Sequence, residues 1–411
     1  MIVEELGAHP ATATAAGVAR GHFTALEVTD ATLERLGAVA QLNAVITVCA
    51  EEARHQAAAR IGGPLAGVSV LVKDLFDTAG IRTTYGSAVF SDHVPARNAA
   101  VVDRVEAAGG VIVGKANLHE FAWGVTSQNE HYGDVRNPLL PDRTPGGSSG
   151  GNAAALAARA CMLGIGTDTG GSVRIPAACC GIVGFKPRTG AIPTRGCLPL
   201  APTFDTVGPM ASSVRDCALL YSVLSGSPPF EPRVQGLRIG VTDDSVDAAR
   251  FESLGARVSS VTLPQELDAF NTVLRFEAAR SHQSTFPARR DEYGIAARDK
   301  WDRAQLVTLA EYNDALSRIS SARSRFARES DVDILVGRTL GSAIPPFDCD
   351  EAEIRDLLGA NARVANVLNL SALAIGSQQI LGWDERIVLG AGLAWEDAYP
   401  HPSGEIASTS Y

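Results

Sequence analysis

A lysine stands directly behind an apolar run in the first quarter of the chain. Lys73 follows Val68-Ser-Val-Leu-Val, which predicts a buried β-strand that ends at an ammonium group. Burying a charged amine is unfavourable, so the group either pairs with a carboxylate or its pKa falls toward neutrality. A lysine that titrates near pH 7 can act as a general base. The alternative is a structural ion pair with Asp74 or Asp77.

A glycine- and serine-rich segment spans residues 145–152, Pro-Gly-Gly-Ser-Ser-Gly-Gly-Asn. No Gly-Lys-Ser/Thr follows, so a phosphate-binding P-loop is excluded. The segment matches the Gly-x-Ser-x-Gly nucleophile pattern twice, at Ser148 and at Ser149. That mechanism needs a histidine downstream, and only His282 and His401 follow. The supply of histidines therefore speaks against a Ser-His-Asp triad.

A third segment places a serine behind two glycines, in Gly164-Ile-Gly-Thr-Asp-Thr-Gly-Gly-Ser172-Val-Arg-Ile-Pro. Consecutive backbone N–H groups in such a turn can converge on one point and bind an anion. A serine hydroxyl on this turn would have oxyanion donors beside it, as acyl transfer requires. The alternative is an ordinary tight turn in which Asp168 and Arg174 pair for structural reasons.

Together the three segments supply a base, hydroxyl groups and an anion-binding turn. They contain no catalytic histidine and no cluster with metal-ligand spacing, so we expect neither a metal nor another cofactor. A serine nucleophile activated by a lysine is an established variant of triad chemistry.

The elements around these segments alternate between helix and strand, which predicts an α/β architecture. Helices are expected at residues 24–36, 50–60, 99–108, 152–160, 269–282 and 311–328, a helical turn at 118–123, and strands at 68–72, 110–114, 161–165, 237–241 and 333–337. No internal repeat or linker interrupts the chain, so a single domain over residues 1–411 is expected.

Composition narrows the class of protein further. The chain has 411 residues, 45% hydrophobic and 20% charged, with a net charge of −10, which disfavours a nucleic-acid binder. No apolar stretch is long enough to span a membrane, and the N-terminus resembles no export signal. Seven irregularly spaced cysteines fit free thiols in a reducing cytoplasm. Only four of the 36 basic residues are lysines, so a lysine beside a glycine-rich site is notable.

These motifs resemble those of the amidase signature family. The resemblance is carried by the segments 145–152, 166–178 and 180–190, flanked by 72–74, 80–84, 114–117, 119–124, 137–138 and 204–209. It is strong over residues 20–220 and weak beyond them. It implies a mixed, mostly parallel central sheet covered on both faces by helices.

The resemblance also implies the roles of individual residues. Ser172 would be the nucleophile, Ser148 the bridging serine behind a cis peptide bond, and neutral Lys73 the base. The oxyanion donors would be the backbone N–H groups of Thr169, Gly170, Gly171 and Ser172. Supporting residues would be Ser149, Asp168 and Arg174, and a substrate-binding loop would contain Thr126, Ser127 and Gln128. Candidate apolar walls are Trp123, Phe204, Phe347 and Trp383.

The expected function is hydrolysis of C–N acyl bonds in a small-molecule amide, with aryl esters and carbamates as related substrates, by a monomer or homodimer. The alternative is the glutaminase subunit of a tRNA-dependent amidotransferase, which would require partner subunits. A binding protein that has lost the chemistry is a third hypothesis, disfavoured because Lys73, Ser148 and Ser172 are all present. Residues 241–254 are shorter than is usual in the family, and residues 370–382 are expected to lack its usual hairpin.

Overall fold

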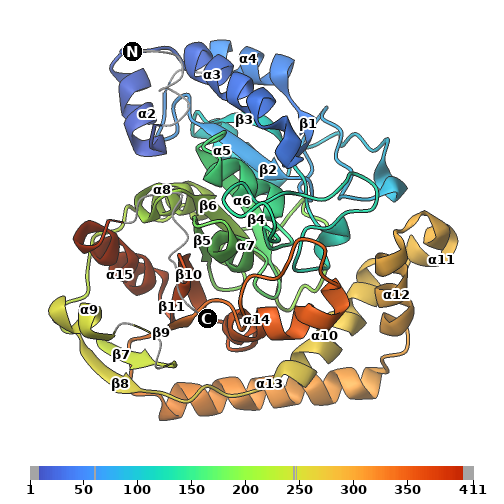
Figure 1. The fold of residues 1–411 in the computed structure, drawn as a ribbon, viewed down its shortest axis with the longest axis vertical. Helices are drawn as coiled ribbons and strands as arrows, with labels where there is room; N and C mark the ends of the chain where they lie inside the picture. Colours follow the sequence, from blue (N-terminus) through green and yellow to red (C-terminus); the bar gives the residue numbers. More distant parts are fainter. Residues whose placement is uncertain (1–8, 60–61, 244–245, 247, 401–411) are drawn as a thin grey trace.

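An eleven-stranded sheet forms the centre of the molecule in the computed structural model, which describes residues 9–59, 62–243, 246 and 248–400 (Figure 1). The strands lie in the order β1-β3-β2-β4-β6-β5-β10-β11-β9-β7-β8. Their bounds are β1 Val45–Val48, β2 Ser69–Lys73, β3 Val111–Ala116, β4 Leu163–Asp168, β5 Val183–Lys186, β6 Thr206–Ala211, β7 Arg238–Val241, β8 Arg257–Ser260, β9 Ile334–Arg338, β10 Ser371–Ile375 and β11 Gln378–Gly382.

The sheet is mixed, as expected, but it is not mostly parallel. Strands β3, β2 and β4 run parallel at one end, and β9, β7 and β8 run parallel at the other. The six remaining pairings, including the whole centre from β4 to β9, are antiparallel. The central strands include a hairpin, and a short hairpin connection can join only antiparallel strands.

Helices cover both faces of this sheet, as expected for the fold class (Figure 1). On β10, Leu373 belongs to a buried cluster with residues of α8 (Val214–Ser225) and α15 (Glu385–Ala398), whereas the next residue, Ala374, belongs to a second cluster with residues of α6 (Gly150–Ala157) and α7 (Arg174–Cys179) on the other face. The helices are α2 Ala11–Ala19, α3 Ala25–Ala38, α4 Ala50–Ala59, α5 Ala100–Ala107, α6 Gly150–Ala157, α7 Arg174–Cys179, α8 Val214–Ser225, α9 Ala248–Ser253, α10 Leu267–Ser281, α11 Phe286–Arg289, α12 Ile295–Ala304, α13 Leu309–Glu329, α14 Glu351–Val367 and α15 Glu385–Ala398.

The predicted elements are present, with their ends shifted by a few residues. Helix α3 begins after Thr24, whose hydroxyl accepts the N–H of Glu27 while the Glu27 carboxylate accepts the N–H of Thr24. This capping box satisfies backbone donors that the first turn leaves free. The predicted turn at 118–123 is the 3₁₀ helix Glu120–Ala122.

The hairpin that residues 370–382 were expected to lack is present. Strands β10 and β11 pair antiparallel from Ser371 with Gly382 to Ile375 with Gln378. Gly376 has a φ of 56° in the two-residue turn between them, a conformation that glycine adopts readily. In the region 241–254, which was expected to be short, residues 244, 245 and 247 lie outside the described residues, and α9 occupies the second half.

The lysines and cysteines of the chain are largely inside it. All four lysines are buried, with exposed fractions of 0 to 8%. All seven cysteines are free thiols, five of them buried and two half-buried. No described helix is long and apolar enough to cross a membrane.

Candidate active site

Lys73 is the last residue of β2 and is wholly buried. Its Nζ donates to Ser148 Oγ at 2.8 Å and to Thr167 Oγ1 at 2.7 Å. Burial lowers the pKa of Lys73 to about 7. The expected alternative, an ion pair with Asp74 or Asp77, does not form among the described residues. Asp74 instead pairs with Lys115 at 3.0 Å, which leaves Lys73 without a carboxylate partner.

Ser148 follows a cis peptide bond from Gly147, as the resemblance implies. Its carbonyl oxygen accepts hydrogen bonds from the His119 N–H and the Ser127 hydroxyl, both at 3.3 Å. A Cβ on Gly147 would lie 2.7 Å from Ser127 N, so the close approach of these two segments requires glycine there. The Ser148 hydroxyl is thereby fixed within hydrogen-bond reach of Lys73.

Ser172 lies in the turn between β4 and α7 and is 6% exposed. Its carbonyl oxygen accepts the Ser149 N–H at 3.2 Å, which ties the two serine-bearing turns together. Within the described residues, no hydrogen bond joins the hydroxyls of Ser172 and Ser148. The structure therefore brings Lys73 to Ser148 directly, and Ser172 to the same segment through its backbone.

Asp168 organises the turn that carries Ser172. Its carboxylate accepts two hydrogen bonds from the guanidinium of Arg174, both at 3.0 Å, and one from Asn366 at 2.9 Å. Burial alone would raise its pKa, but the charge and hydrogen bonds of Arg174 hold the pKa of Asp168 well below its usual range. The ion pair between Asp168 and Arg174, which was expected as a structural alternative, is therefore present. It stabilises the turn that carries Ser172.

The backbone donors of this turn divide between two tasks. The Gly171 N–H, expected to face an oxyanion, instead donates to Asp168 Oδ1 at 2.8 Å. The N–H groups of Thr169, Gly170 and Ser172 donate to no acceptor within the described part of the chain. Thr169 is anchored by its hydroxyl, which donates to Asp205 at 2.6 Å. The donors open to an anion are thus fewer than the four expected.

The expected substrate loop is only partly open to a ligand. Ser127 is fully buried and binds the Ser148 carbonyl, and Thr126, which is 1% exposed, donates to Gln128 Oε1 at 3.0 Å. Gln128 lines a cavity of about 590 Å³, together with Trp123. The cavity is large enough for a small-molecule ligand.

The other expected aromatic walls, Phe204, Phe347 and Trp383, do not line this cavity. Phe204 is buried against Phe270 with ring centres 4.7 Å apart, and a Cβ on Gly170 would lie 2.8 Å from Phe270. Phe347 lies under the guanidinium of Arg136 at 4.3 Å, and Trp383 stacks on Phe326 of α13. Phe204 thus backs an aromatic wall beside the Ser172 turn.

Sequence reasoning missed several residues of the site. Thr167, the second partner of Lys73, lies inside a segment that the sequence does single out. Asn366 and Gln379 bind Arg174 at 2.8 and 2.9 Å from positions 192 and 205 residues away. No local motif marks these two residues. No group of side chains suited to hold a metal ion occurs among the described residues.

A family model and several known proteins are similar to this chain over much of its length. The Amidase family model matches residues 27–268. A glutamyl-tRNA(Gln) amidotransferase subunit from Roseiflexus sp. (strain RS-1) is 44% identical over 60% of this chain, a match that spans only 58% of that relative. The subunit of the same name from Thermus thermophilus is 35% identical over 93% of this chain and 96% of its own length.

Solved structures agree in fold. A structure described as an amidase superposes with a TM-score of 0.86 at 29% identity, covering 95% of this chain and 99% of its own. The 6-aminohexanoate cyclic dimer hydrolase gives 0.85 at 27% identity, covering 96% of this chain and 98% of its own. The peptide amidase of Stenotrophomonas maltophilia gives 0.84 at 26%, covering 97% and 99%.

Proposed function

Because the chain belongs to the amidase family, we propose that it hydrolyses a C–N acyl bond with Ser172 as nucleophile, Ser148 as bridge and Lys73 as base. The observation that carries this proposal is the buried Lys73 amine, 2.8 Å from Ser148 Oγ and without a carboxylate partner among the described residues. With a pKa of about 7, a large fraction of this amine is uncharged at neutral pH and has a lone pair for a proton.

In the acylation step, the Ser172 hydroxyl gives its proton to Ser148 as its oxygen attacks the substrate carbonyl carbon. Ser148 passes its own proton to Lys73. The carbonyl becomes a tetrahedral oxyanion, which the backbone N–H groups of Thr169, Gly170 and Ser172 stabilise. The proton then returns through Ser148 to the leaving nitrogen, the C–N bond breaks, and an ester of Ser172 remains.

In the deacylation step, a water molecule takes the place of the amine. It loses a proton along the same path to Lys73 and attacks the ester carbon. The acid leaves as Ser172 recovers its proton. No metal or organic cofactor is needed in this scheme, because the lysine supplies the base and the backbone supplies the anion site.

Buried aromatic side chains pack behind the turn that carries Ser172. Phe270 and Phe204 form the wall next to Gly170. The guanidinium of Arg363 lies 5.5 Å from the Phe270 ring centre but is paired with Asp356 at 2.6 Å. Aryl esters and carbamates offer the same acyl chemistry as amides, with other leaving groups.

A second candidate is the glutaminase subunit of a tRNA-dependent amidotransferase. The Thermus thermophilus relative matches over 96% of its own length, and this likeness favours that function. In that role the chain would release ammonia from glutamine, and its turnover would depend on partner subunits.

The test is to offer the purified protein a panel of aryl amides, esters and carbamates, and glutamine separately. We expect turnover of members of the panel without added partners, and Ser172→Ala should lower it at least about 10³-fold while leaving the fold intact. A fluorophosphonate should add to Ser172, as read by peptide mass spectrometry. Glutamine turnover that appears only with added amidotransferase subunits, without activity on the panel, would favour the second candidate instead.

A further inference from the structure

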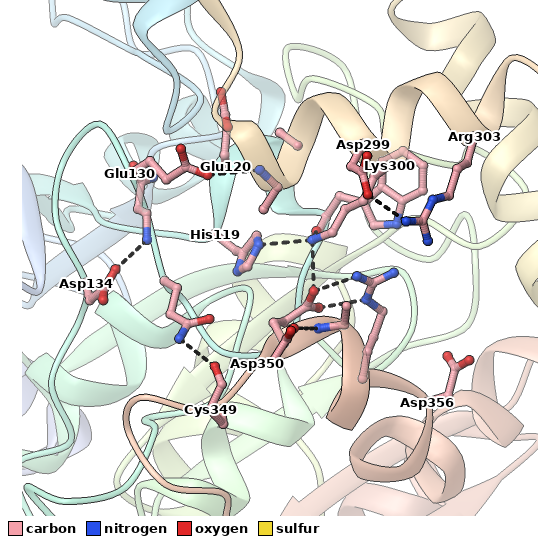
Figure 2. Close-up of a pocket in the computed structure, with 18 of the residues that line it drawn as sticks. His119, Glu120, Glu130, Asp134, Asp299, Lys300, Arg303, Cys349, Asp350 and Asp356 are labelled. Carbon is pink, nitrogen blue, oxygen red and sulfur yellow. Dashed lines mark hydrogen bonds and ion pairs between the residues drawn. The ribbon is translucent and has the colours of Figure 1, made fainter.

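The cavity of about 590 Å³ has a charged floor that the proposed reaction does not use (Figure 2). It lies between the segment 119–134, helix α12 and the start of helix α14. Three lining side chains from these elements, His119, Lys300 and Glu351, contact one another. Figure 2 shows His119 and Lys300 pointing toward each other. All three are more than nine-tenths buried.

Lys300 has no N–H left for a ligand. Its Nζ donates to the Trp123 carbonyl oxygen at 2.6 Å and to His119 Nε2 at 3.2 Å, and it lies 3.1 Å from Glu351 Oε2. An ammonium group has three donors, and all three are engaged inside the protein. Lys300 therefore acts on these neighbours rather than on a molecule in the cavity.

Glu351 completes the attachment. Its Oε1 accepts the backbone N–H of Val125 at 3.3 Å, and Arg355 pairs with its Oε2 at 2.6 Å. Burial alone would raise the pKa of Glu351, but the charge of Lys300 and the hydrogen bonds of Arg355 bring this pKa below its usual range. The Glu351 carboxylate thus stays ionised. The segment 119–127 is held at the Trp123 carbonyl by the Lys300 ammonium group and at the Val125 N–H by the Glu351 carboxylate.

The segment that they hold is the one that contacts Ser148. The N–H of His119 and the hydroxyl of Ser127, at its two ends, both donate to the Ser148 carbonyl. Between and at these ends Phe121, Ala122 and Ser127 have φ values of 51°, 62° and 59°. Residues other than glycine keep such a backbone only where surrounding contacts enforce it.

We propose that Lys300, with Glu351, is a positioning residue for Ser148. By fixing residues 119–127 from the two helices α12 and α14, it holds the Ser148 carbonyl, and with it the Ser148 hydroxyl, in line for proton transfer. This inference rests on the proposed role of Ser148 in the reaction. In this proposal, two residues from the last third of the chain, Lys300 and Glu351, help to position a serine of the proton path.

His119 takes part in this arrangement as a neutral group. Burial, and then the charge of Lys300, lower the pKa of His119 to about 3. The imidazole is therefore uncharged at neutral pH and accepts a hydrogen bond from Lys300 at Nε2. Its place beside Ser148 serves hydrogen bonding and packing, not acid–base catalysis.

A double-mutant cycle on kcat separates positioning from general stability. We expect Lys300→Met to lower kcat about tenfold or more in the wild-type background, through slower acylation with a smaller change in KM. In the Ser148→Ala background, where no bridging hydroxyl remains to be positioned, the same change should lower kcat less than about twofold. Lys186→Met is the matched control, because Lys186 is also buried and donates to the carbonyls of Pro187 and Leu370.

In the double variant of Lys186→Met and Ser148→Ala, the fold-decrease in kcat should equal the product of the two single decreases. If Lys300→Met does not fold, Glu351→Gln takes its place in the same cycle, because it removes the ion pair but keeps an acceptor for Val125. Equal losses from Lys300→Met, or from Glu351→Gln, in both backgrounds would overturn the inference. An unchanged kcat in Ser148→Ala alone would instead overturn the proposed role of Ser148, so the two failures are distinguishable.

Discussion

At the scale of single residues, the site depends on one amine that is buried without an opposite charge. In the part of the chain that the structure describes, Lys73 has two hydroxyl partners and no carboxylate partner, whereas the neighbouring Lys115 keeps an ion pair with Asp74. A carboxylate beside Lys73 would favour its charged form and remove the base. The proposed reaction therefore depends on Asp74 pairing with Lys115 and not with Lys73, and burial of Lys73 alone would not be enough.

The pH dependence of the reaction follows from this environment. The active form of Lys73 is the neutral amine, so kcat/KM for an uncharged aryl amide should rise with pH through an apparent pKa of about 7 and then level off. Initial rates between pH 5.5 and 9 in a constant-ionic-strength buffer measure this profile. Lys73→Met should lower kcat/KM about 10²- to 10⁴-fold and abolish the limb near pH 7. A wild-type profile that is flat from pH 6 to 8 would contradict the assignment of Lys73 as base.

At the scale of elements, the turn from β4 to α7 gains its shape from contacts on both sides. Asp168 takes the N–H of Gly171 and the side chain of Arg174, and Asn366 of α14 closes this network from the far end of the chain. Because the Gly171 N–H points to Asp168, the turn is bent so that other backbone N–H groups are left open. The network thus determines which donors can meet an oxyanion.

Gly171 tests how closely this turn must be held. Its φ is +113°, and a Cβ there would lie 2.7 Å from Ala362 Cβ and 2.8 Å from Ile175 Cδ1. Gly171→Ala should therefore displace the turn, lower kcat about tenfold or more and lower Tm. Gly226→Ala is the matched control, because Gly226 has a φ of +79° with nothing within 4 Å of its added Cβ. It should lower Tm alone, and wild-type kcat in Gly171→Ala would show that the turn tolerates displacement.

The strands near the site and its main residues can be predicted from the sequence, but the sheet order and the long-range contacts cannot. Apolar runs at 68–72 and 110–114 predict their strands, and motif resemblance leads to Lys73, Ser148 and Ser172. The antiparallel centre of the sheet is not visible in the same way, because fully buried strands such as β4 and β6 show no alternation that fixes a neighbour. Contacts such as Asn366 with Asp168, 198 positions apart, are set by packing and leave no local pattern.

At the scale of the whole molecule, the titratable groups inside the chain respond to pH in opposite directions. Burial lowers the pKa of Lys73 and of Lys186 to about 7, and it also lowers that of Lys115 and Lys300. Burial raises the pKa of the thiols, to about 12 in Cys49 and to about 11 in Cys161. The folded protein thus loses its lysine protons at lower pH, and its thiol protons at higher pH, than the unfolded chain does.

Linkage turns these shifts into a stability optimum on the alkaline side. Between pH 7 and 10.5 the unfolded chain binds lysine protons that the folded chain has released, so the free energy of unfolding rises with pH. Above pH 9.0 the unfolded thiols ionise while the buried ones stay protonated, and stability is lost. We therefore expect the free energy of unfolding, from urea titrations at constant ionic strength, to peak near pH ~9.

Lys186→Met isolates the lysine contribution to that optimum, because Lys186 lies outside the proposed proton path. Removing it should flatten the rise between pH 7 and 9 and leave the decline above pH 9 unchanged, since the thiols are untouched. Its absolute stability shifts as well, so the slope of the free energy of unfolding against pH is the quantity to compare. A variant whose slope equals that of the wild type would mean that Lys186 keeps its proton in the folded state up to an ordinary pKa.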